Sequence, residues 1–223
     1  MMGDSLGGIV VMSAVIIAMI AYFCGCFNGA VIVSKYILHD DVRTHGSGNA
    51  GLTNFHRTFG GALTFVVILT DMLKAVVALW LSGVVLRWFG TGAGDIAFVM
   101  AQYWAALFCL LGHMFPCMFG FKGGKGILSG GTIALIVDWR VALVVWGGFL
   151  ILVLLTRYVS LGSVWAGASF PFISWYCFRE PAIIVLAFLC GGLVVWKHRG
   201  NIQRLIQGNE RKLSFHKKKE GRQ

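Results

Sequence analysis

The stretch "LGGIVVMSAVIIAMIAYFCGCFNGAVIVS", Leu6–Ser34, contains no charged residue. A helix needs about 20 apolar residues to cross the hydrocarbon core of a membrane, so this run is long enough to span it. No Lys or Arg precedes the run, and it is too long for the apolar core of a signal peptide, so we expect no cleavage there. The sequence therefore predicts an integral membrane protein whose spans are helices, since they are far too long for barrel strands.

The composition of the whole chain agrees with this prediction. Of its 223 residues, 57% are hydrophobic and 13% are charged, and the mean hydropathy is +0.78. A soluble domain carries about 25% charged residues. The six cysteines show neither CxxC nor Cys/His spacing, so we interpret them as buried apolar side chains and expect no metal site. We predict an all-α, polytopic membrane helix bundle.

Apolar segments predict seven transmembrane helices, at 7–34, 59–86, 96–121, 126–137, 141–156, 161–178 and 181–196. If the fourth and fifth were one helix, it would be about 46 Å long, against a core of about 30 Å. It would also bury Asp138 and Arg140 in the membrane, at a cost of about 2.5–3.5 kcal/mol each. A five-span arrangement is the alternative, and the two differ in the side on which Thr156–Ser163 lies.

The distribution of positive charge predicts the orientation. Nine of the 19 Lys and Arg residues lie from Lys197 onward, whereas the loops on the side of the N-terminus hold three, namely Arg87, Arg140 and Arg179. The positive-inside rule then places the N-terminus outside and the C-terminus in the cytoplasm. We divide the chain into one integral membrane domain, 1–212, and a basic cytoplasmic tail, 213–223. The tail suits membrane lipids with anionic headgroups rather than nucleic acid.

Four polar stretches fall on the predicted cytoplasmic face, at 45–60, 122–126, 156–163 and 197–212. The first, "HGSGNAGLTNFHRTFG", combines glycines, hydroxyls, amides and a guanidinium that could surround an anion. Its candidate substrate-contacting residues are Ser47, Asn49, Thr53, Asn54 and Arg57. A plain polar loop between helices is an equally weighted alternative for this stretch alone.

The second stretch, "KGGKG", sets Lys122 and Lys125 among Gly123, Gly124 and Gly126. It is no Walker A loop, because neither Ser nor Thr follows Lys125, so nucleotide hydrolysis is not expected. Exposed main-chain N–H groups, two ammonium groups and a helix beginning at Ile127 instead predict an anion site. Lysines that reach from an apolar segment to the membrane interface are the alternative.

The other two stretches add further candidate binding groups. Ser160 contributes a hydroxyl, and His198, Asn201 and Arg204 are spaced so that they share one helix face. Glu210 is the carboxylate that could neutralise an arginine there.

Two charged residues lie inside the second apolar segment. Asp71 and Lys74 stand three residues apart there. Unpaired charges in a span are costly, so we expect them to pair or to face the bundle interior, in a structural role.

Together these segments predict the handling of phosphate-bearing substrates at the lipid boundary. The sequence shows no Cys/His cluster, no paired carboxylates and no nucleophile elbow. A membrane transporter of a phosphorylated metabolite is the alternative, but it calls for polar groups on both faces or at the midplane and for repeat symmetry, whereas these polar stretches cluster on the cytoplasmic face.

Three motifs, "SGNAGLTNFHR", "GHMFPCMFGFKGGKG" and "HRGNIQRLIQGNE", resemble the signature motifs of the bacterial acyl-phosphate:glycerol-3-phosphate acyltransferases, the PlsY family. The resemblance implies seven membrane helices in the bacterial cytoplasmic (inner) membrane and an active site that faces the cytoplasm. It implies acyl transfer from acyl phosphate to the sn-1 hydroxyl of glycerol 3-phosphate, which yields lysophosphatidic acid and inorganic phosphate in the first committed step of phospholipid biosynthesis. It implies no cofactor, and a functional link to the enzyme that makes acyl phosphate.

The resemblance also implies roles for single residues. Ser47 and Arg57 match the essential first motif, His198 and Asn201 an active-site pair, and Glu210 a structural carboxylate. The glycines of 122–126 match a phosphate loop in which Lys125 is the cation. For the proton of the attacking hydroxyl, a substrate phosphate, whose second pKa is about 6, and His198 are alternative acceptors. An acylated Ser47 ranks lowest, because the sequence fixes no histidine beside it.

Overall fold

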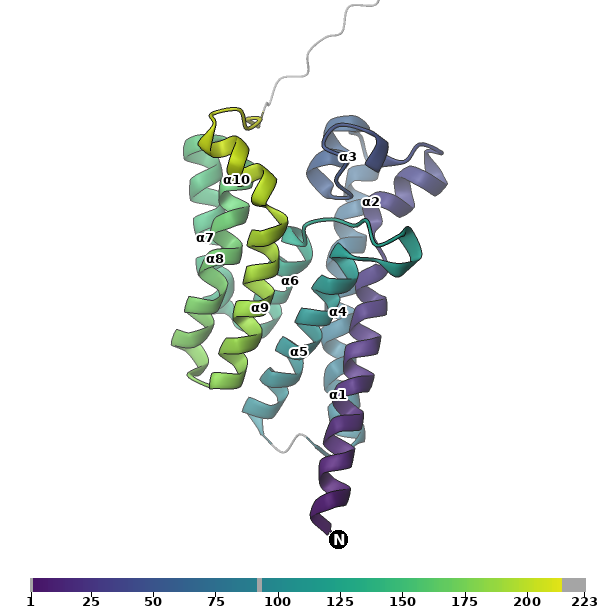
Figure 1. The fold of residues 1–223 in the computed structure, drawn as a ribbon, viewed down its shortest axis with the longest axis vertical. Coiled ribbons are helices and arrows are strands. Elements are labelled where there is room, and N and C mark those ends of the chain that lie inside the picture. The colour runs from purple at the N-terminus through teal and green to yellow at the C-terminus, as the bar shows by residue number, and fades with distance from the viewer. Residues whose placement is uncertain (1, 92–93, 214–223) are drawn as a thin grey trace, which may run out of the picture.

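The computed structural model describes residues 2–91 and 94–213, with side-chain surroundings from residue 7, and within them every regular element is helical (Figure 1). The seven longest helices are α1 (Met2–Cys26), α4 (Leu63–Trp88), α5 (Asp95–Met114), α6 (Ile127–Val137), α7 (Trp139–Thr156), α8 (Val159–Phe178) and α9 (Pro181–Lys197). The shorter elements are α2 (Gly29–Ile32), a π turn (Val33–Ile37), two 3₁₀ turns (Val42–Thr44 and Cys117–Phe119), α3 (Leu52–Thr58) and α10 (Arg199–Ile206). The predicted all-α class is confirmed.

Four segments are long and apolar enough to cross a membrane: Gly7–Cys26, Leu63–Trp88, Asp95–Phe119 and Trp139–Thr156. The pair α9 and α10, bent by 55°, makes a fifth if it is counted as one span. Helix α6 has 11 residues, or about 16 Å at 1.5 Å per residue, which is short for a span. The described helices therefore fit a membrane protein with four or five apolar spans by length and composition.

The first apolar run is not one helix, contrary to the predicted segment 7–34. Helix α1 ends at Cys26, and Asn28 caps α2 by accepting a hydrogen bond from the Val31 N–H (3.1 Å). The Asn28 amide also donates to the carbonyl of Ala50 (3.0 Å), and the Phe27 carbonyl accepts from Lys74 (3.1 Å). The polar groups freed by the break are thus satisfied from distant parts of the chain, which hydropathy alone could not reveal.

The predicted boundary between α6 and α7 is confirmed. Asp138 has an extended main chain and accepts the Arg140 N–H at 2.7 Å, so it caps the first turn of α7. The guanidinium of Arg140 pairs with the same carboxylate at 2.8 Å. This arrangement excludes a continuous helix over 126–156.

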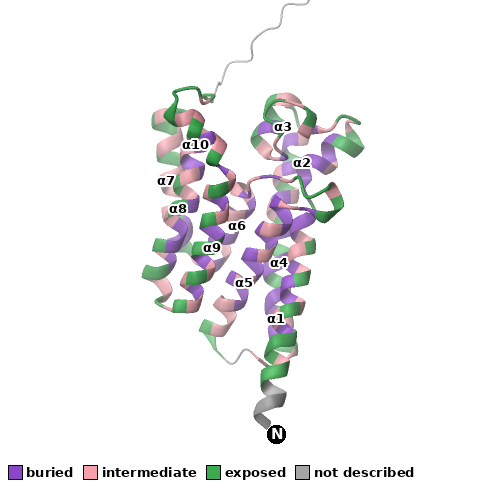
Figure 2. Cartoon of the chain, in the orientation of Figure 1, coloured by how far each residue is buried: buried purple, intermediate pink, exposed green. Residues whose placement is uncertain are grey.

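The long helices form two groups with α6 between them. Helices α1, α4 and α5 pack together on one side, and α7, α8 and α9 on the other (Figure 1). The fully buried side chains of Tyr103, Met114, Ile133 and Ile183 lie in the core that joins the groups. Large apolar side chains such as Phe65, Trp80 and Leu154 are exposed, and Figure 2 shows exposed positions along the outward faces of the helices. An apolar outer surface of this kind suits contact with lipid.

The interpretation that all six cysteines are buried is confirmed for Cys26, Cys109 and Cys190, whereas Cys24 and Cys177 are only partly buried. All six are free thiols, and Cys117 is exposed. Its Sγ lies 3.9 Å from the Sγ of buried Cys26.

Candidate active site

A cavity of about 450 Å³ is lined in part by residues of α3 and α10. All four polar stretches contribute to its lining, with residues from 46–57, 125–128, 159–163 and 198–211. Its volume lies within the range of about 300–1,000 Å³ that is typical of small-molecule sites. The fold therefore gathers segments that are far apart in the sequence around one cavity.

Most of the predicted site residues border this cavity. They are Ser47, Asn49, Thr53, Asn54, Arg57, Asp71, Lys125, Gly126, Ser160, His198, Asn201, Arg204 and Glu210. Four others do not border it, namely Lys74, Lys122, Gly123 and Gly124. Of the two lysines in the glycine-rich loop, Lys125 alone faces the cavity, whereas Lys122 is exposed. The prediction that Lys122 binds phosphate therefore lacks the geometric support that Lys125 has.

A chain of hydrogen bonds orients Lys125. Its ammonium donates to Oδ1 of Asn201, and the Asn201 amide donates to Oε1 of Glu210 at 2.9 Å. The other carboxylate oxygen of Glu210 accepts from Nε of Arg204 at 2.8 Å. Three residues of the third motif thus hold the cation of the second motif in place.

The charges in this network shift one another's pKa values. Burial, reinforced by nearby Arg204, Lys197 and Arg57 and opposed by Glu210, lowers the pKa of Lys125 to about 8. Burial alone would raise the pKa of Glu210, but hydrogen bonds from Asn201 and Arg204 outweigh it and lower that pKa. Glu210 is therefore an anion at neutral pH, as its predicted structural role requires.

Helix α6 begins at the cavity, as predicted, with Ile127 as its first residue. Its N-cap, Gly126, has φ +80°, a left-handed conformation that glycine adopts without steric cost. No side chain caps this helix start. The N-terminal end of a helix carries partial positive charge and free N–H groups, so it favours an anion.

Gly124 lies beside the cavity and packs against protein atoms. A Cβ at this position would collide with the imidazole of His113, and it would lie 2.6 Å from the carbonyl oxygen of Ala50. The Gly124 N–H donates to the carbonyl of His113 at 3.1 Å. We expected the absent side chain to give a phosphate access to the main chain, but it makes room for α5 and the first motif.

Asn54 organises the loop of the first motif. Its amide nitrogen lies within hydrogen-bond distance of the carbonyls of Val42 (3.0 Å), His45 (3.1 Å) and Asn49 (3.1 Å). Its Oδ1 accepts the N–H of Ser47 at 3.1 Å. With these atoms engaged, the side chain of Asn54 shapes the loop that presents Ser47.

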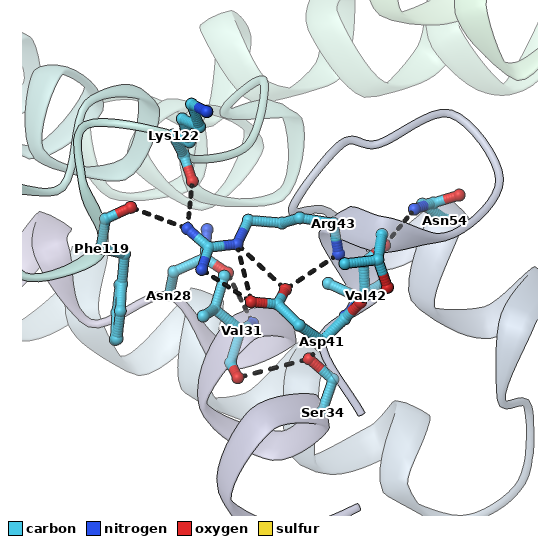
Figure 3. A network of polar contacts seen from close by, with 10 residues as sticks. Asn28, Val31, Ser34, Asp41, Val42, Arg43, Asn54, Phe119 and Lys122 are labelled. Atoms are coloured by element: carbon cyan, nitrogen blue, oxygen red, sulfur yellow. Dashed lines mark hydrogen bonds and ion pairs between the residues drawn. The ribbon is translucent and has the colours of Figure 1, made fainter. Parts of the chain in front are cut away.

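Arg43, which the sequence did not single out, connects the first two motifs (Figure 3). Its Nη1 donates to the carbonyls of Phe119 (2.7 Å) and Lys122 (3.3 Å). Its Nη2 pairs with Asp41 at 2.7 Å, and this hydrogen bond lowers the pKa of the Asp41 carboxyl. Asp41 thus positions the arginine that joins the two loops.

His198 is buried, and its hydrogen bond determines which ring nitrogen carries the proton. Its Nδ1 lies 2.8 Å from the carbonyl of Val194, so Nδ1 carries a proton and donates. The neutral ring then has its lone pair on Nε2, and the residue borders the cavity. Among the described residues, the hydroxyl of Ser47 makes no hydrogen bond to a histidine, unlike an activated serine nucleophile.

Asp71 and Lys74 form an ion pair of 2.7 Å, with 2% and 3% of their side-chain surface exposed. Lys74 also lies 2.6 Å from Nδ1 of His113, a residue that the sequence did not single out. Their spacing on α4 predicted the pair, but a partner 39 positions away on α5 left no local signal.

Part of the cavity wall is apolar. Leu128, Trp146, Phe149 and Val159 line it from α6, α7 and α8. A smaller apolar crevice of about 30 Å³ adjoins it at Gly126 and Ile127. A cavity lined by both cations and apolar side chains suits an amphiphile with a phosphate group. Within the described residues, no group of three or more His, Cys, Asp or Glu side chains could hold a metal ion.

Comparisons with known proteins show the family of this chain. The profile of the family described as "Glycerol-3-phosphate acyltransferase" matches residues 15–208. A relative of that name from Clostridioides difficile (strain 630) is 39% identical over 206 residues, which cover 91% of this chain and 97% of the relative. Another, from Photorhabdus laumondii, is 35% identical over 214 residues, which cover 94% of this chain and 92% of the relative.

Solved structures with the same fold are also known. The crystal structure of PlsY (YgiH), an integral membrane glycerol 3-phosphate acyltransferase, in its glycerol 3-phosphate form matches with a TM-score of 0.79 and 31% identity. Its lysophosphatidic acid form matches with a TM-score of 0.75 and 30% identity. Each comparison covers 91% of this chain and 96% of the other. The chain therefore belongs to the glycerol-3-phosphate acyltransferase family.

Proposed function

We propose that this membrane acyltransferase takes a fatty acyl group from acyl phosphate and transfers it to the sn-1 hydroxyl of glycerol 3-phosphate. The products are lysophosphatidic acid and inorganic phosphate, in the first committed step of phospholipid biosynthesis. The family membership favours this function over the transport of a phosphorylated metabolite. An enzyme that makes acyl phosphate would then supply the donor.

The observation that carries the proposal is the charge of the cavity lining. Four cations border it, namely Arg57, Lys125, Arg204 and Arg211, against the two carboxylates Asp71 and Glu210. Glu210 is engaged by Arg204, which leaves Arg57 and Arg211 without an ion pair among the described side chains. This excess of positive charge and the free start of α6 suit two phosphate groups. The apolar wall suits the acyl chain.

The reaction needs positioning more than chemical activation, because acyl phosphate is a mixed anhydride. The sn-1 oxygen attacks the acyl carbon, the bond from that carbon to the phosphate oxygen breaks, and phosphate leaves with the electron pair. Arg57 and Lys125 would hold the phosphates and neutralise the charge that develops. The hydroxyl proton passes either to a phosphate oxygen or to Nε2 of His198, whose lone pair is free.

The remaining site residues would support this arrangement. Ser47, Asn49 and Thr53 would offer hydrogen bonds to the substrates, whereas the Oγ of Ser160 is enclosed, so the structure does not support its predicted contact. Asn201 and Arg204 hold Lys125 and Glu210. Gly123, Gly124 and Gly126 let the loop pack between α5 and the first motif.

We also propose seven spans, with the N-terminus outside and the active site facing the cytoplasm of a bacterium, in its inner membrane. The alternation of the seven long helices and the cap at Asp138 support this count. Helix α6 has 11 residues, and irregular main chain before it, such as 115–126, is tolerated at membrane depth where it is buried in protein or lines a cavity. The proposed domain covers 1–212. Of the proposed tail, 213–223, Leu213 binds the carbonyl of Arg157 (2.7 Å) through its N–H, and 214–223 lie outside the described residues.

The test uses purified protein with a long-chain acyl phosphate and glycerol 3-phosphate. We expect lysophosphatidic acid and inorganic phosphate in a 1:1 ratio, and no product from acyl-CoA or from acyl carrier protein. Transfer from either of these donors, but not from acyl phosphate, would refute the proposed donor. Uptake of glycerol 3-phosphate into liposomes without acylation would favour transport.

A further inference from the structure

The floor of the cavity holds a second polar group, separate from the cationic network of Lys125. Asp71 of α4 and His113 of α5 both border the cavity, although 2% and 3% of their side-chain surface is exposed. His113 Nδ1 lies 3.8 Å from Oδ1 of Asp71, so the two side chains are neighbours. The mechanism above uses neither of them.

A hydrogen bond from Lys74 determines which ring nitrogen of His113 carries the proton. An ammonium has three N–H donors and no acceptor. Lys74 Nζ directs them to Oδ1 of Asp71 (2.7 Å), the carbonyl of Phe27 (3.1 Å) and Nδ1 of His113 (2.6 Å). Nδ1 of His113 is therefore an acceptor, and the neutral ring carries its proton on Nε2.

Two polar atoms of this group remain without a partner. Oδ1 of Asp71 accepts from Lys74 and from the Gly29 N–H (3.4 Å), but neither Oδ2 of Asp71 nor Nε2 of His113 makes a hydrogen bond with any described residue. Among the described residues, only the Oγ atoms of Ser160 and Ser169 are side-chain polar atoms that are both inaccessible to solvent and without a hydrogen bond. The free atoms of Asp71 and His113 are thus open to the cavity that both residues border.

One acceptor and one donor side by side match a hydroxyl group, which donates one hydrogen bond and accepts another. A phosphate offers no match, because the carboxylate of Asp71 would repel it. A reacting hydroxyl fits poorly too, since accepting a hydrogen bond from Nε2–H would reduce its nucleophilicity. A non-reacting hydroxyl of the acceptor fits both atoms.

We propose that Oδ2 of Asp71 and Nε2–H of His113 bind the sn-2 hydroxyl of glycerol 3-phosphate and make the enzyme select for it. The inference rests on the proposed acceptor, which has one reacting and one non-reacting hydroxyl. It assigns Lys74 a positioning role, because Lys74 fixes both the carboxylate and the tautomer of His113. Gly124 shares in this function, since a Cβ there would take the place of Nε2.

The test compares glycerol 3-phosphate with propane-1,3-diol monophosphate, which lacks the sn-2 hydroxyl. Without this hydroxyl both Asp71 and His113 stay unpaired, so we expect kcat/KM of the wild-type enzyme to be at least about 10- to 100-fold lower for the analogue. Equal kcat/KM values for the two acceptors would overturn the proposal. Calorimetry compares the binding of the same two phosphates without turnover. A failure of the proposed acyltransferase activity can therefore be distinguished from a failure of the proposed sn-2 hydroxyl site.

Two substitutions of His113 separate binding from architecture. His113→Asn keeps an oxygen near the position of Nδ1 for Lys74 but does not reach the position of Nε2. His113→Gln places an N–H near the position of Nε2 but removes the acceptor for Lys74. We expect His113→Asn to lose the discrimination between the two acceptors and His113→Gln to keep it. A purely structural role would instead lower kcat/KM for both acceptors in parallel and preserve their ratio in both variants, which would refute the proposal.

Discussion

Loss of the proton from Lys125 at high pH has opposite effects on the stability of the fold and on the binding of phosphate. Its ammonium group faces the cavity, and burial lowers its pKa to about 8 from an ordinary value of 10.5. The unfolded chain binds more protons than the folded chain between these values, so this group makes the fold more stable as pH rises from about 8 to about 10.5. The same loss of charge weakens the attraction for a phosphate.

We therefore expect kcat/KM for glycerol 3-phosphate to fall above pH 8, by about tenfold per pH unit, because the ammonium is lost. Initial rates of acyl transfer between pH 6.5 and 9.5 measure the profile. Lys125→Arg is the matched control: a guanidinium does not titrate in this range, so its alkaline limb should be flat even where its activity is lower. The same inflection near pH 8 in both proteins would assign the decline to another group.

Gly124→Ala should raise KM for glycerol 3-phosphate by at least about tenfold and destabilise the protein by about 1–3 kcal/mol. The added methyl group would displace the imidazole of His113 and press on the carbonyl of Ala50. Steady-state kinetics and thermal unfolding in detergent measure the two effects. Gly192→Ala on α9 is the control, since no atom lies within 4 Å of its Cβ, and it should behave like the wild type. An unchanged KM in Gly124→Ala would show that the loop adapts.

At the scale of elements, the same short motif serves two purposes. In both Asp41–Arg43 and Asp138–Arg140, the aspartate accepts the main-chain N–H and pairs with the guanidinium of the arginine two positions later. Arg43 reaches further, to the carbonyls of Phe119 and Lys122, whereas Arg140 makes no such contact in the described chain. The motif near the cavity therefore joins two loops, and the other one caps the start of α7.

This difference makes Arg140 a matched control for Arg43. We expect Arg43→Lys to raise KM for glycerol 3-phosphate several-fold and to speed amide exchange in 117–124, because a single ammonium cannot replace the guanidinium fork. Kinetics and hydrogen–deuterium exchange measure these effects. Arg140→Lys should leave both unchanged. Equal effects of the two substitutions would mean that Arg43 acts on local stability and not on the contact between loops.

The elements show which parts of this fold the sequence could predict. Helix limits followed from hydropathy and from local signals such as Asp138, and α6 starts at the predicted Ile127. The break at Asn28, the Arg43 connection and the contact between Lys74 and His113 depend on partners 22 to 79 positions away. Such contacts form only when the helices pack together. The sequence could therefore predict which segments line the cavity, but not the contact between Lys74 and His113 at its floor.

At the scale of the whole molecule, the number of membrane crossings can be tested. In a cysteine-free background, we expect Lys122→Cys and Tyr158→Cys to react with a membrane-impermeant maleimide from the cytoplasmic side. Arg87→Cys and Arg140→Cys should react from the opposite side. Right-side-out and inside-out vesicles give the two readings. If Tyr158→Cys reacts together with Arg87→Cys, five spans are correct and the seven-span topology is wrong.

The polar and apolar parts of the cavity lining imply that the rate depends on the concentration of one substrate in water and of the other in the membrane. Glycerol 3-phosphate is dissolved in water, so its molarity determines how often it arrives. An acyl donor is dissolved in the bilayer, so its mole fraction among the lipids matters instead. Inert lipid added at a constant amount of donor would then slow the reaction, although no bulk concentration changes. Growth of the membrane surface would dilute the donor in the same way, so the rate of acyl transfer would fall as membrane area increases.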